Sequence, residues 1–483
     1  MRRIVAPTAA AIAGAALALV GLSTAGTAAA TPARPTVTSL NRVGVASTGG
    51  STLTVHGTNF RGVTAVTFGA AHGTGVKVKS AKVLTVSVPA HVIGSVDVRV
   101  TARGGRSATS VHDRLAYLTT NAIDAGSEMT CSSAIKSLPF CFGNGEHGQT
   151  GNGVVSATAQ KNALVRIPGV PPIAEMSLGS AFACALAFNG TVWCWGDNEG
   201  GELGNGLSAT DSPTPTVVHL PPAVAIAAGY DSACAVLRDR TLRCWGRNDA
   251  GELGRGDYTD ATTPVTPTGH LHVTALAAGS ETTCAIDTTR HAWCWGQNHF
   301  GEVGDGTTQN RYGPVRVSDL GTVTDIESSA MSDSMCALTV AERVECWGYN
   351  VHGQLGNGST ADADTPQPVP GLTGVSALAV GGGHACAVSG RFKLPSCWGD
   401  NTHGQLGLDR VGGPDVLSPT SLDDVAGVTD ISAGYNHTCA VSRQQDVPVP
   451  AEYCWGGDAY GQLGDDGTTD NGTPFDFSGR VPG

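Results

Sequence analysis

The sequence is poor in positive charge and in aromatic residues. Lysine occurs six times in 483 residues, the formal net charge is −12, and aromatic residues make up 5% of the chain. Binding to a phosphate backbone requires clustered positive charge, so we expect no nucleic-acid partner. Few aromatic residues together with 66 glycines favour short strands and tight turns over long helices.

Long apolar runs are also missing after the N-terminal segment. No later stretch approaches the roughly 20 apolar residues of a membrane helix, so we expect no membrane span. Residues 1–30 begin with Met1-Arg2-Arg3, continue with an Ala/Leu/Val-rich run and end at Ala28-Ala29-Ala30. This pattern is typical of an export signal. We therefore predict a secreted protein, either free outside the cell or associated with the cell wall.

A Cys-x-x-Cys motif is absent, so the sequence lacks the usual signature of a zinc or thioredoxin-like site. The 14 cysteines instead form seven successive pairs, and an even count in a secreted chain indicates disulfides. In one pair, a three-residue loop, Phe188-Asn189-Gly190, would place Cys184 opposite Cys194 on neighbouring strands. The predicted bonds are Cys131–Cys141, Cys184–Cys194, Cys234–Cys244, Cys284–Cys294, Cys336–Cys346, Cys386–Cys397 and Cys439–Cys454.

The stretch VWCWGDNEGGELGNG, residues 192–206, recurs with variations so that the chain contains seven copies, in a repeat whose first cysteines are 50 to 53 residues apart. Each repeat contains about four short strand patterns, which predicts a seven-bladed β-propeller over residues 119–483. The region begins inside a repeat near Asn121 and ends with an extra strand pattern, Gly472–Gly479. We therefore expect the C-terminal strand to complete the first blade.

Residues 36–118 alternate between polar and apolar residues in short segments, which predicts a β-sandwich. Its motifs Gly57-Thr58-Asn59-Phe60 and Ala65-Val66-Thr67-Phe68-Gly69 resemble those of the immunoglobulin-like TIG (IPT) domain. Members of that family are usually spacers or binding modules. The predicted fold class is therefore all-β, with an immunoglobulin-like sandwich before a seven-bladed propeller.

The repeated pattern Cys-Trp-Gly-x-Asn-x-x-Gly-[Gln/Glu]-Leu-Gly resembles the regulator of chromosome condensation repeat family, in its secreted bacterial type. That resemblance implies a seven-bladed propeller. The family includes a nuclear exchange factor for the GTPase Ran, secreted bacterial proteins and a secreted β-lactamase inhibitor. An exported chain without a long inserted wedge argues against exchange activity.

Inhibitory members of this family bind through the loop between the innermost strand and the next one. The matching positions give the candidate partner-binding residues Phe182, Tyr230, Glu281, His384, Tyr435 and His437. We expect a monomer that binds an extracellular protein or a cell-wall polymer. The alternatives are a polysaccharide-binding module, an inhibitor of the β-lactamase type and, less favoured, a propeller enzyme.

Other repeated residues have structural interpretations. Tryptophans after the second cysteine are expected to pack between blades, and the repeated Glu, Gln and Asn to bond loop backbone. We expect no catalytic residue, no cofactor and no metal site, because His384 and His437 lack equivalents in the other repeats. The long hairpin Ser442–Glu452 is either a contact element or a surface insertion.

Overall fold

A computed structural model describes residues 32–41, 44–46, 49–91, 94–118, 123–133, 139–155, 165–171, 173–443 and 450–478. The export signal predicted for residues 1–30 and the tip of the long hairpin, residues 444–449, lie outside these ranges. In the described residues the protein is built from β-strands, with two single-turn 3-10 helices, η1 (Val111–Asp113) and η2 (Thr268–His270).

The N-terminal part is a sandwich of two sheets, ordered β1-β3-β7-β6 and β2-β10-β8-β4-β5, with β9 paired to β8. Its strands are β1 (Thr36–Leu40), β2 (Gly44–Ala46), β3 (Thr52–Thr58), β4 (Ala65–Phe68), β5 (Ala71–His72), β6 (Thr74–Val78), β7 (Val83–Ser87), β8 (Gly94–Ala102), β9 (Gly105–Arg106) and β10 (Arg114–Leu118). Alternate residues of facing strands, such as Val55, Phe68, Leu84 and Val98, are fully buried between the sheets. The predicted sandwich is confirmed.

The C-terminal part is a propeller of seven four-stranded antiparallel sheets. From the central channel outwards the blades are β11 (Ile123–Ala125), β12 (Met129–Ser132), β13 (Phe140–Gly143), β14 (Val165–Arg166); β15 (Ile173–Leu178), β16 (Phe182–Ala187), β17 (Val192–Gly196), β18 (Ser212–Val218); β19 (Ala223–Ala228), β20 (Ser232–Leu237), β21 (Leu242–Gly246), β22 (Ala261–Val265); β23 (Val273–Ala278), β24 (Thr282–Asp287), β25 (Ala292–Gly296), β26 (Arg311–Arg316); β27 (Val323–Glu327), β28 (Ser334–Thr339), β29 (Val344–Gly348), β30 (Ala363–Pro368); β31 (Ala377–Val380), β32 (His384–Ser389), β33 (Leu394–Gly399), β34 (Val416–Ser421); and β35 (Val428–Ala433), β36 (His437–Ser442), β37 (Ala451–Gly456), β38 (Asn471–Asp476). We number these blades 1 to 7.

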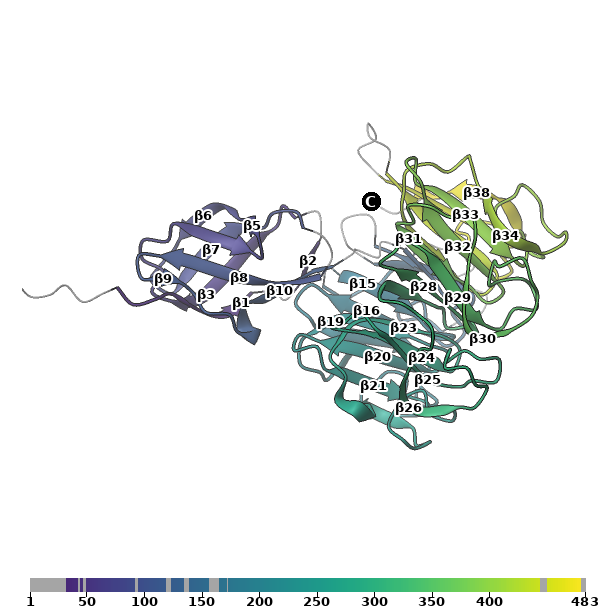
Figure 1. The fold of residues 1–483 in the computed structure, drawn as a ribbon, viewed down its shortest axis with the longest axis horizontal. Coiled ribbons are helices and arrows are strands. Elements are labelled where there is room, and N and C mark those ends of the chain that lie inside the picture. The colour runs from purple at the N-terminus through teal and green to yellow at the C-terminus, as the bar shows by residue number, and fades with distance from the viewer. Residues whose placement is uncertain are drawn as a thin grey trace, which may run out of the picture.

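Each innermost strand contacts the innermost strands of both neighbouring blades, so the ring is closed. The sandwich lies beside the propeller next to β15 and β19 (Figure 1).

The expected way of closing the ring was wrong. The C-terminal strand β38 pairs with β37 inside blade 7, and the outer strand of blade 1 is β14. Every blade is therefore continuous in sequence, and the proline-containing strand ends a repeat rather than beginning it. An outermost strand suits proline, because its free edge needs no backbone donor.

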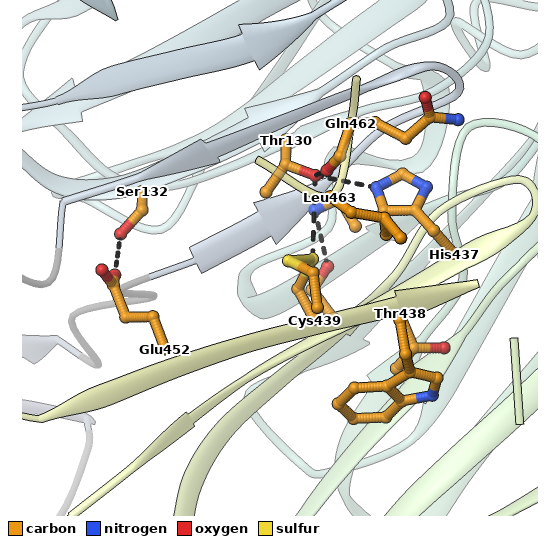
Figure 2. The surroundings of a disulfide bond; sticks show 12 residues. Thr130, Ser132, His437, Thr438, Cys439, Glu452, Gln462 and Leu463 are labelled. Carbon is orange, nitrogen blue, oxygen red and sulfur yellow. Dashed lines mark hydrogen bonds between the residues drawn. A yellow bond between two sulfur atoms is a disulfide. The ribbon is translucent and has the colours of Figure 1, made fainter. Parts of the chain in front are cut away.

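Side chains, not an exchanged strand, join blade 7 to blade 1 (Figure 2). Thr130 Oγ1 donates to the carbonyl of Gln462 at 2.8 Å, so it accepts from His437 Nε2, also at 2.8 Å. Ser132 donates to the Glu452 carboxyl at one end of the long hairpin. The Phe142 and Phe477 rings meet edge to face, with centroids 5.2 Å apart.

The other junctions use tryptophan. The indole Nε1 of the tryptophan that follows the second cysteine of a blade donates to the carbonyl of the repeated Glu or Gln in the preceding blade. The six bonds, 2.8–2.9 Å long, join Trp195 to Gln149, Trp245 to Glu202, Trp295 to Glu252, Trp347 to Glu302, Trp398 to Gln354 and Trp455 to Gln405. All six rings are fully buried, which confirms their predicted position between blades.

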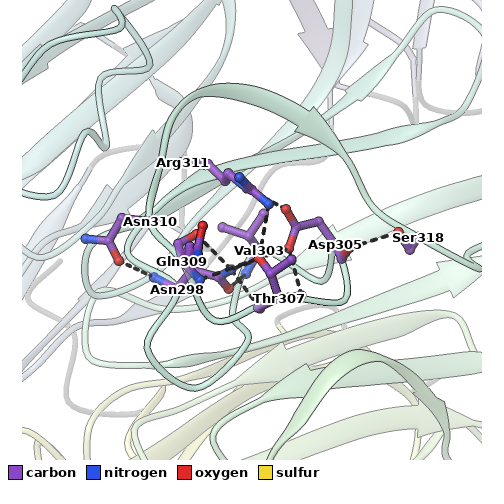
Figure 3. Close-up of polar contacts among 8 residues, drawn as sticks. All are labelled: Asn298, Val303, Asp305, Thr307, Gln309, Asn310, Arg311 and Ser318. Carbon is purple, nitrogen blue, oxygen red and sulfur yellow. Dashed lines mark hydrogen bonds and ion pairs between the residues drawn. The ribbon is translucent and has the colours of Figure 1, made fainter.

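The loop after each third strand is held by its own side chains. Asn298 Nδ2 donates to the carbonyls of Thr307 and Gln309 at 2.8 and 3.1 Å, and its Oδ1 accepts from Val303 N (Figure 3). Glu202 similarly accepts from the backbone N–H of Gly200 at 2.9 Å. The predicted structural role of these repeated residues is confirmed.

All seven predicted disulfides are present, with Cα–Cα distances of 4.0–4.1 Å. Each joins directly opposed residues of the second and third strands, as in the pair Cys184 and Cys194. Gly190, with φ of +88°, closes the predicted three-residue loop of that hairpin.

We predict that Thr130→Val destabilises the protein by about 1–3 kcal/mol, because it removes the partner of His437 and the donor to Gln462. Thr283→Val is the matched control. Thr283 also donates to a loop carbonyl, that of Glu252, but Trp295 still donates to that oxygen. Guanidinium unfolding of the oxidised proteins measures both. Equal losses for the two variants would contradict the proposed role of Thr130.

We also expect non-reducing peptide mapping to recover seven intra-blade disulfides. A Cys439 peptide linked to any cysteine other than Cys454 would show that the register of the longest hairpin is wrong.

Candidate partner-binding rim

Two sets of loops meet at one end of the propeller. The second and third strands of a blade are antiparallel neighbours, so the start of the second strand lies beside the end of the third. The loop before the second strand is therefore next to the segment that follows the third. In blade 2 the N–H of Asp197 donates to Ala181 O at 3.0 Å, and in blade 3 the N–H of Arg247 donates to Asp231 O at 2.9 Å. We call this end the acidic rim. It comprises residues 126–128, 179–181, 229–231, 279–281, 328–333, 381–383 and 434–436, and 144–147, 197–200, 247–250, 297–300, 349–352, 400–403 and 457–460.

Negative charge dominates the acidic rim. Its carboxylic acids are Glu128, Glu146, Asp197, Glu199, Asp231, Asp249, Glu281, Asp333 and Asp400. Asp458 also lies in these segments, but it is fully buried and burial raises its pKa to about 8, so it adds no surface charge at neutral pH. Arg247 is the single arginine or lysine of these segments, all of which the structure describes. It lies 2.8 Å from Asp231 and 3.2 Å from Asp249. Most of these carboxylates therefore have no arginine or lysine of the rim beside them, and the basic side chains next to Asp197 and Asp400 are the histidines His147 and His352.

The acidic groups of the rim are close enough to affect one another. Burial and then the carboxylates of Asp333 and Asp249 raise the pKa of Glu281. Burial also raises the pKa of Asp333, and that of Asp231 in spite of its bond to Arg247. A cationic partner would relieve this repulsion, so the rim is suited to a basic surface.

Aromatic side chains lie among the acidic residues of the rim. Tyr230 is 38% exposed and Tyr435 43% exposed, both in the loops around the channel mouth. The ring of Tyr435 packs over Gly382, where a Cβ atom would lie 2.4 Å from it. Further out, the Phe300 and Tyr349 rings pair across two blades at 4.7 Å.

Three of the six predicted binding residues are accessible and three are not. Tyr230, Tyr435 and the half-buried Glu281 lie on the rim, as predicted. Phe182, His384 and His437 are fully buried, so their prediction as contact residues was wrong.

The cause of this burial is the same in all three cases. The first residue of the second strand turns back over the glycine of its own loop, so that its ring occupies the space where a Cβ atom would lie at Gly179, Gly381 or Gly434. His384 and His437 instead bond Thr438 and Thr130 of the next blade, at 2.7 and 2.8 Å. Their buried positions lower their pKa to about 4 and about 3, so both are neutral.

Sequence reasoning also missed rim residues. Phe300, Tyr349 and Tyr460 lie in the segments after the third strand, which were treated only as structural turns. The signal that could have found them is their variation: at these positions the repeats lack a common residue.

Backbone hydrogen bonds hold the loops of the rim together. The N–H of Ser180 donates to Tyr230 O, that of Tyr230 to Ser280 O, and that of Ser280 to Ser332 O. Equivalent bonds join Gly382 to Gly434 and Tyr435 to Gly126. These bonds, 2.9–3.2 Å long, fix Tyr230 and Tyr435 on a preformed surface.

The sequence profile of the RCC1-like domain matches residues 140–440, more than half of the chain, and that of the IPT/TIG domain matches residues 35–117. The chain belongs to the RCC1-like domain family. Among curated relatives, this RCC1-like chain is 36% identical over 135 residues to the ultraviolet-B receptor UVR8 of Arabidopsis thaliana, covering 27% of this chain and 29% of the receptor. It is 31% identical over 165 residues to mouse serine/threonine-protein kinase Nek9, covering 31% of this chain and 16% of the kinase. The matches thus span less than a third of these relatives.

Solved structures agree on the fold. Yeast RCC1, in its crystal structure with Kap60, superposes with a TM-score of 0.63 at 21% identity, covering 75% of this chain and 85% of that one. Human WBSCR16 gives a TM-score of 0.59 at 20% identity, covering 67% and 86%. Within the described ranges, no helix of the RCC1-like chain is long and apolar enough to cross a membrane.

The central channel of this RCC1-like propeller is also acidic. Its innermost strands carry Asp124, Glu175, Asp325, Glu327 and Asp430, all partly exposed. Burial raises the pKa of Glu175 to about 8, and that of Asp124 to about 7. For Glu327, burial and then four surrounding carboxylates raise the pKa further. Glu175 and Glu327 therefore hold a proton at neutral pH, and Asp124 does so in part.

The raised pKa values of the channel carboxyl groups predict that the stability of the protein depends on pH. A carboxyl with a raised pKa in the folded state stabilises that state at low pH, and this contribution is lost as pH rises through the raised value. We therefore expect the melting temperature to fall between pH 7 and pH 9, where the histidines are neutral in both states.

Glu175→Gln should reduce this dependence, because the amide keeps an oxygen for the backbone N–H of Ile226 without a proton to lose. Asp257→Asn, at an exposed carboxyl with a lowered pKa, is the control and should leave the dependence above pH 7 unchanged. A melting temperature that does not fall with pH, or that falls equally in Glu175→Gln, would contradict the prediction.

Proposed function

We propose that this protein is exported and acts by binding, without catalysis, and that its acidic rim binds a basic surface of an extracellular protein. The observation that carries the proposal is the charge of that rim, where many carboxylates face a single arginine around two exposed tyrosines. Electrostatic complementarity speeds association and selects the partner. Tyrosine is one of the residue types that most often dominate the binding energy of an interface.

The opposite rim supports this choice of face. Its loops, between the second and third strands, carry mostly basic residues in the described part of the chain: Arg238, Arg240, Arg290, Arg343, Arg391, Lys393 and Arg443. The sandwich contacts this rim, since Arg238 Nη2 donates to His112 O at 3.0 Å and to Arg114 O. The sandwich thus covers part of the basic rim and leaves the acidic rim open, which suits a spacer.

Export is supported by the disulfides and by the N-terminal sequence. Seven buried disulfides without a free cysteine among the described residues are typical of a protein that folds in an oxidising compartment.

The test is capture of a partner from the host's secreted proteins and cell-wall extract by the oxidised chain from Thr31. We expect a stoichiometric protein whose affinity falls at least tenfold in the double variant Tyr230→Ala, Tyr435→Ala, because a hot-spot tyrosine contributes about 2 kcal/mol or more. Glu281→Lys should slow association, and high salt should do the same.

Phe392→Ala is the matched control, since this ring is 70% exposed on the opposite rim. Loss of binding in this variant alone would place the interface on the other face. Capture of wall polymer alone would replace the proposal with the polysaccharide-binding alternative.

A further inference from the structure

We propose that two blade junctions at the edge of the acidic rim each bind one divalent transition-metal ion, through His147, Asp197 and Asp211 between blades 1 and 2, and through His352, Asp400 and Asp415 between blades 5 and 6. The proposal goes beyond partner binding, and four of its six residues, His147, Asp197, His352 and Asp400, also belong to the acidic rim. It stands on side-chain geometry, on its repetition and on the place of the two junctions in the ring.

The first group brings three loops together. His147 Nδ1 lies 3.1 Å from Asp211 Oδ2 and 3.9 Å from Asp197 Oδ1. Ligands bound at 2.0–2.2 Å in a tetrahedron are about 3.3–3.5 Å apart, so small movements would place all three around one ion. The second oxygen of Asp211 accepts from the N–H of Asn198 at 3.3 Å, which directs the first one towards His147.

The second group repeats the first at equivalent positions. His352 Nδ1 lies 3.1 Å from Asp415 Oδ2, and the ligand atoms of all three residues lie within 4.8 Å of one another. His147 and His352 both precede the glycine of the Gly-Gln motif, and Asp197 and Asp400 both follow Cys-Trp-Gly. Two groups of the same composition therefore arise from the same positions of the repeat.

A third junction provides a natural control. His403 Nδ1 lies 2.7 Å from Asp470 Oδ2 between blades 6 and 7. Gly457 stands there in place of Asp197 or Asp400, so only two of the three donors are present. Two donors are too few for a stable site of this kind.

The two complete groups lie at particular junctions. Among the described residues, the loop-to-loop backbone bonds around the channel mouth are found at every junction except those between blades 1 and 2 and between blades 5 and 6. In blade 5 the N–H of Ser332 donates instead to Ser329 O within its own loop. A metal ion would thus join the blades where the loops do not.

The donor set indicates the class of ion. Imidazole nitrogen suits Zn²⁺ and its neighbours in the first transition row, whereas Mg²⁺ and Ca²⁺ prefer oxygen alone. Asp197 also belongs to a carboxylate group with Glu202 and Asp231, which increases the local attraction for a cation. Water would complete the coordination, because His147 is 44% exposed.

Zn²⁺ titration of the tag-free, oxidised chain by isothermal calorimetry at pH 7 tests the proposal. We expect saturable binding of two ions per chain, one ion in either Asp197→Asn or Asp400→Asn, and none in the double variant. His403→Ala should still bind two ions. A hundredfold excess of Mg²⁺ should leave the binding intact.

Absence of saturable binding to the unmodified chain would overturn the proposal. So would a double variant that still binds two ions, or a loss of binding in His403→Ala. Each variant is first compared with the unmodified chain in its metal-free melting temperature. If an asparagine variant does not fold, His147→Ala and His352→Ala replace the pair and carry the same expectation.

Discussion

The hydrogen bond from a buried indole to a loop carbonyl of the preceding blade is the interaction on which this propeller depends. It fixes two things at once, because Trp295 packs its ring between blades while its Nε1 holds Glu252 O in place. The same loop is shaped from inside by Glu252 and by an asparagine, here Asn248. At the closing junction Phe142 lacks the donor, and Thr130 supplies it to Gln462 instead. The same hydrogen bonds therefore join neighbouring blades and hold the loops in shape.

This rigid frame separates charge between the two ends of the molecule. Loops that begin the second strand and follow the third carry the acidic residues, and hairpins between these strands carry the basic ones. The sandwich contacts the basic end through Arg238. A face that is negative, aromatic and preformed remains open around Tyr230 and Tyr435. The proposed binding face has more aromatic side chains than the sequence indicated, because Phe300 and Tyr349 also lie on this rim.

Much of the fold was predictable because residue spacing within a repeat determines how neighbouring strands of a blade pair. The spacing of Cys184 and Cys194 sets the hairpin register, and with it the disulfide. Contacts between blades were less predictable. Whether His437 points to the rim or into the next blade depends on its packing over Gly434, which the spacing does not encode. The prediction that the C-terminal strand completes blade 1 was wrong for a similar reason. In the sequence, a proline-containing strand at the end of one repeat looks the same as one at the start of the next.

Hydrogen–deuterium exchange of the protein with and without its captured partner tests the central claim most directly, because it locates the contact without any substitution. We expect new protection in residues 229–231, 279–281 and 434–436 of the acidic rim. Protection confined to the sandwich or to the hairpins of the basic rim, such as residues 390–393, would contradict the account.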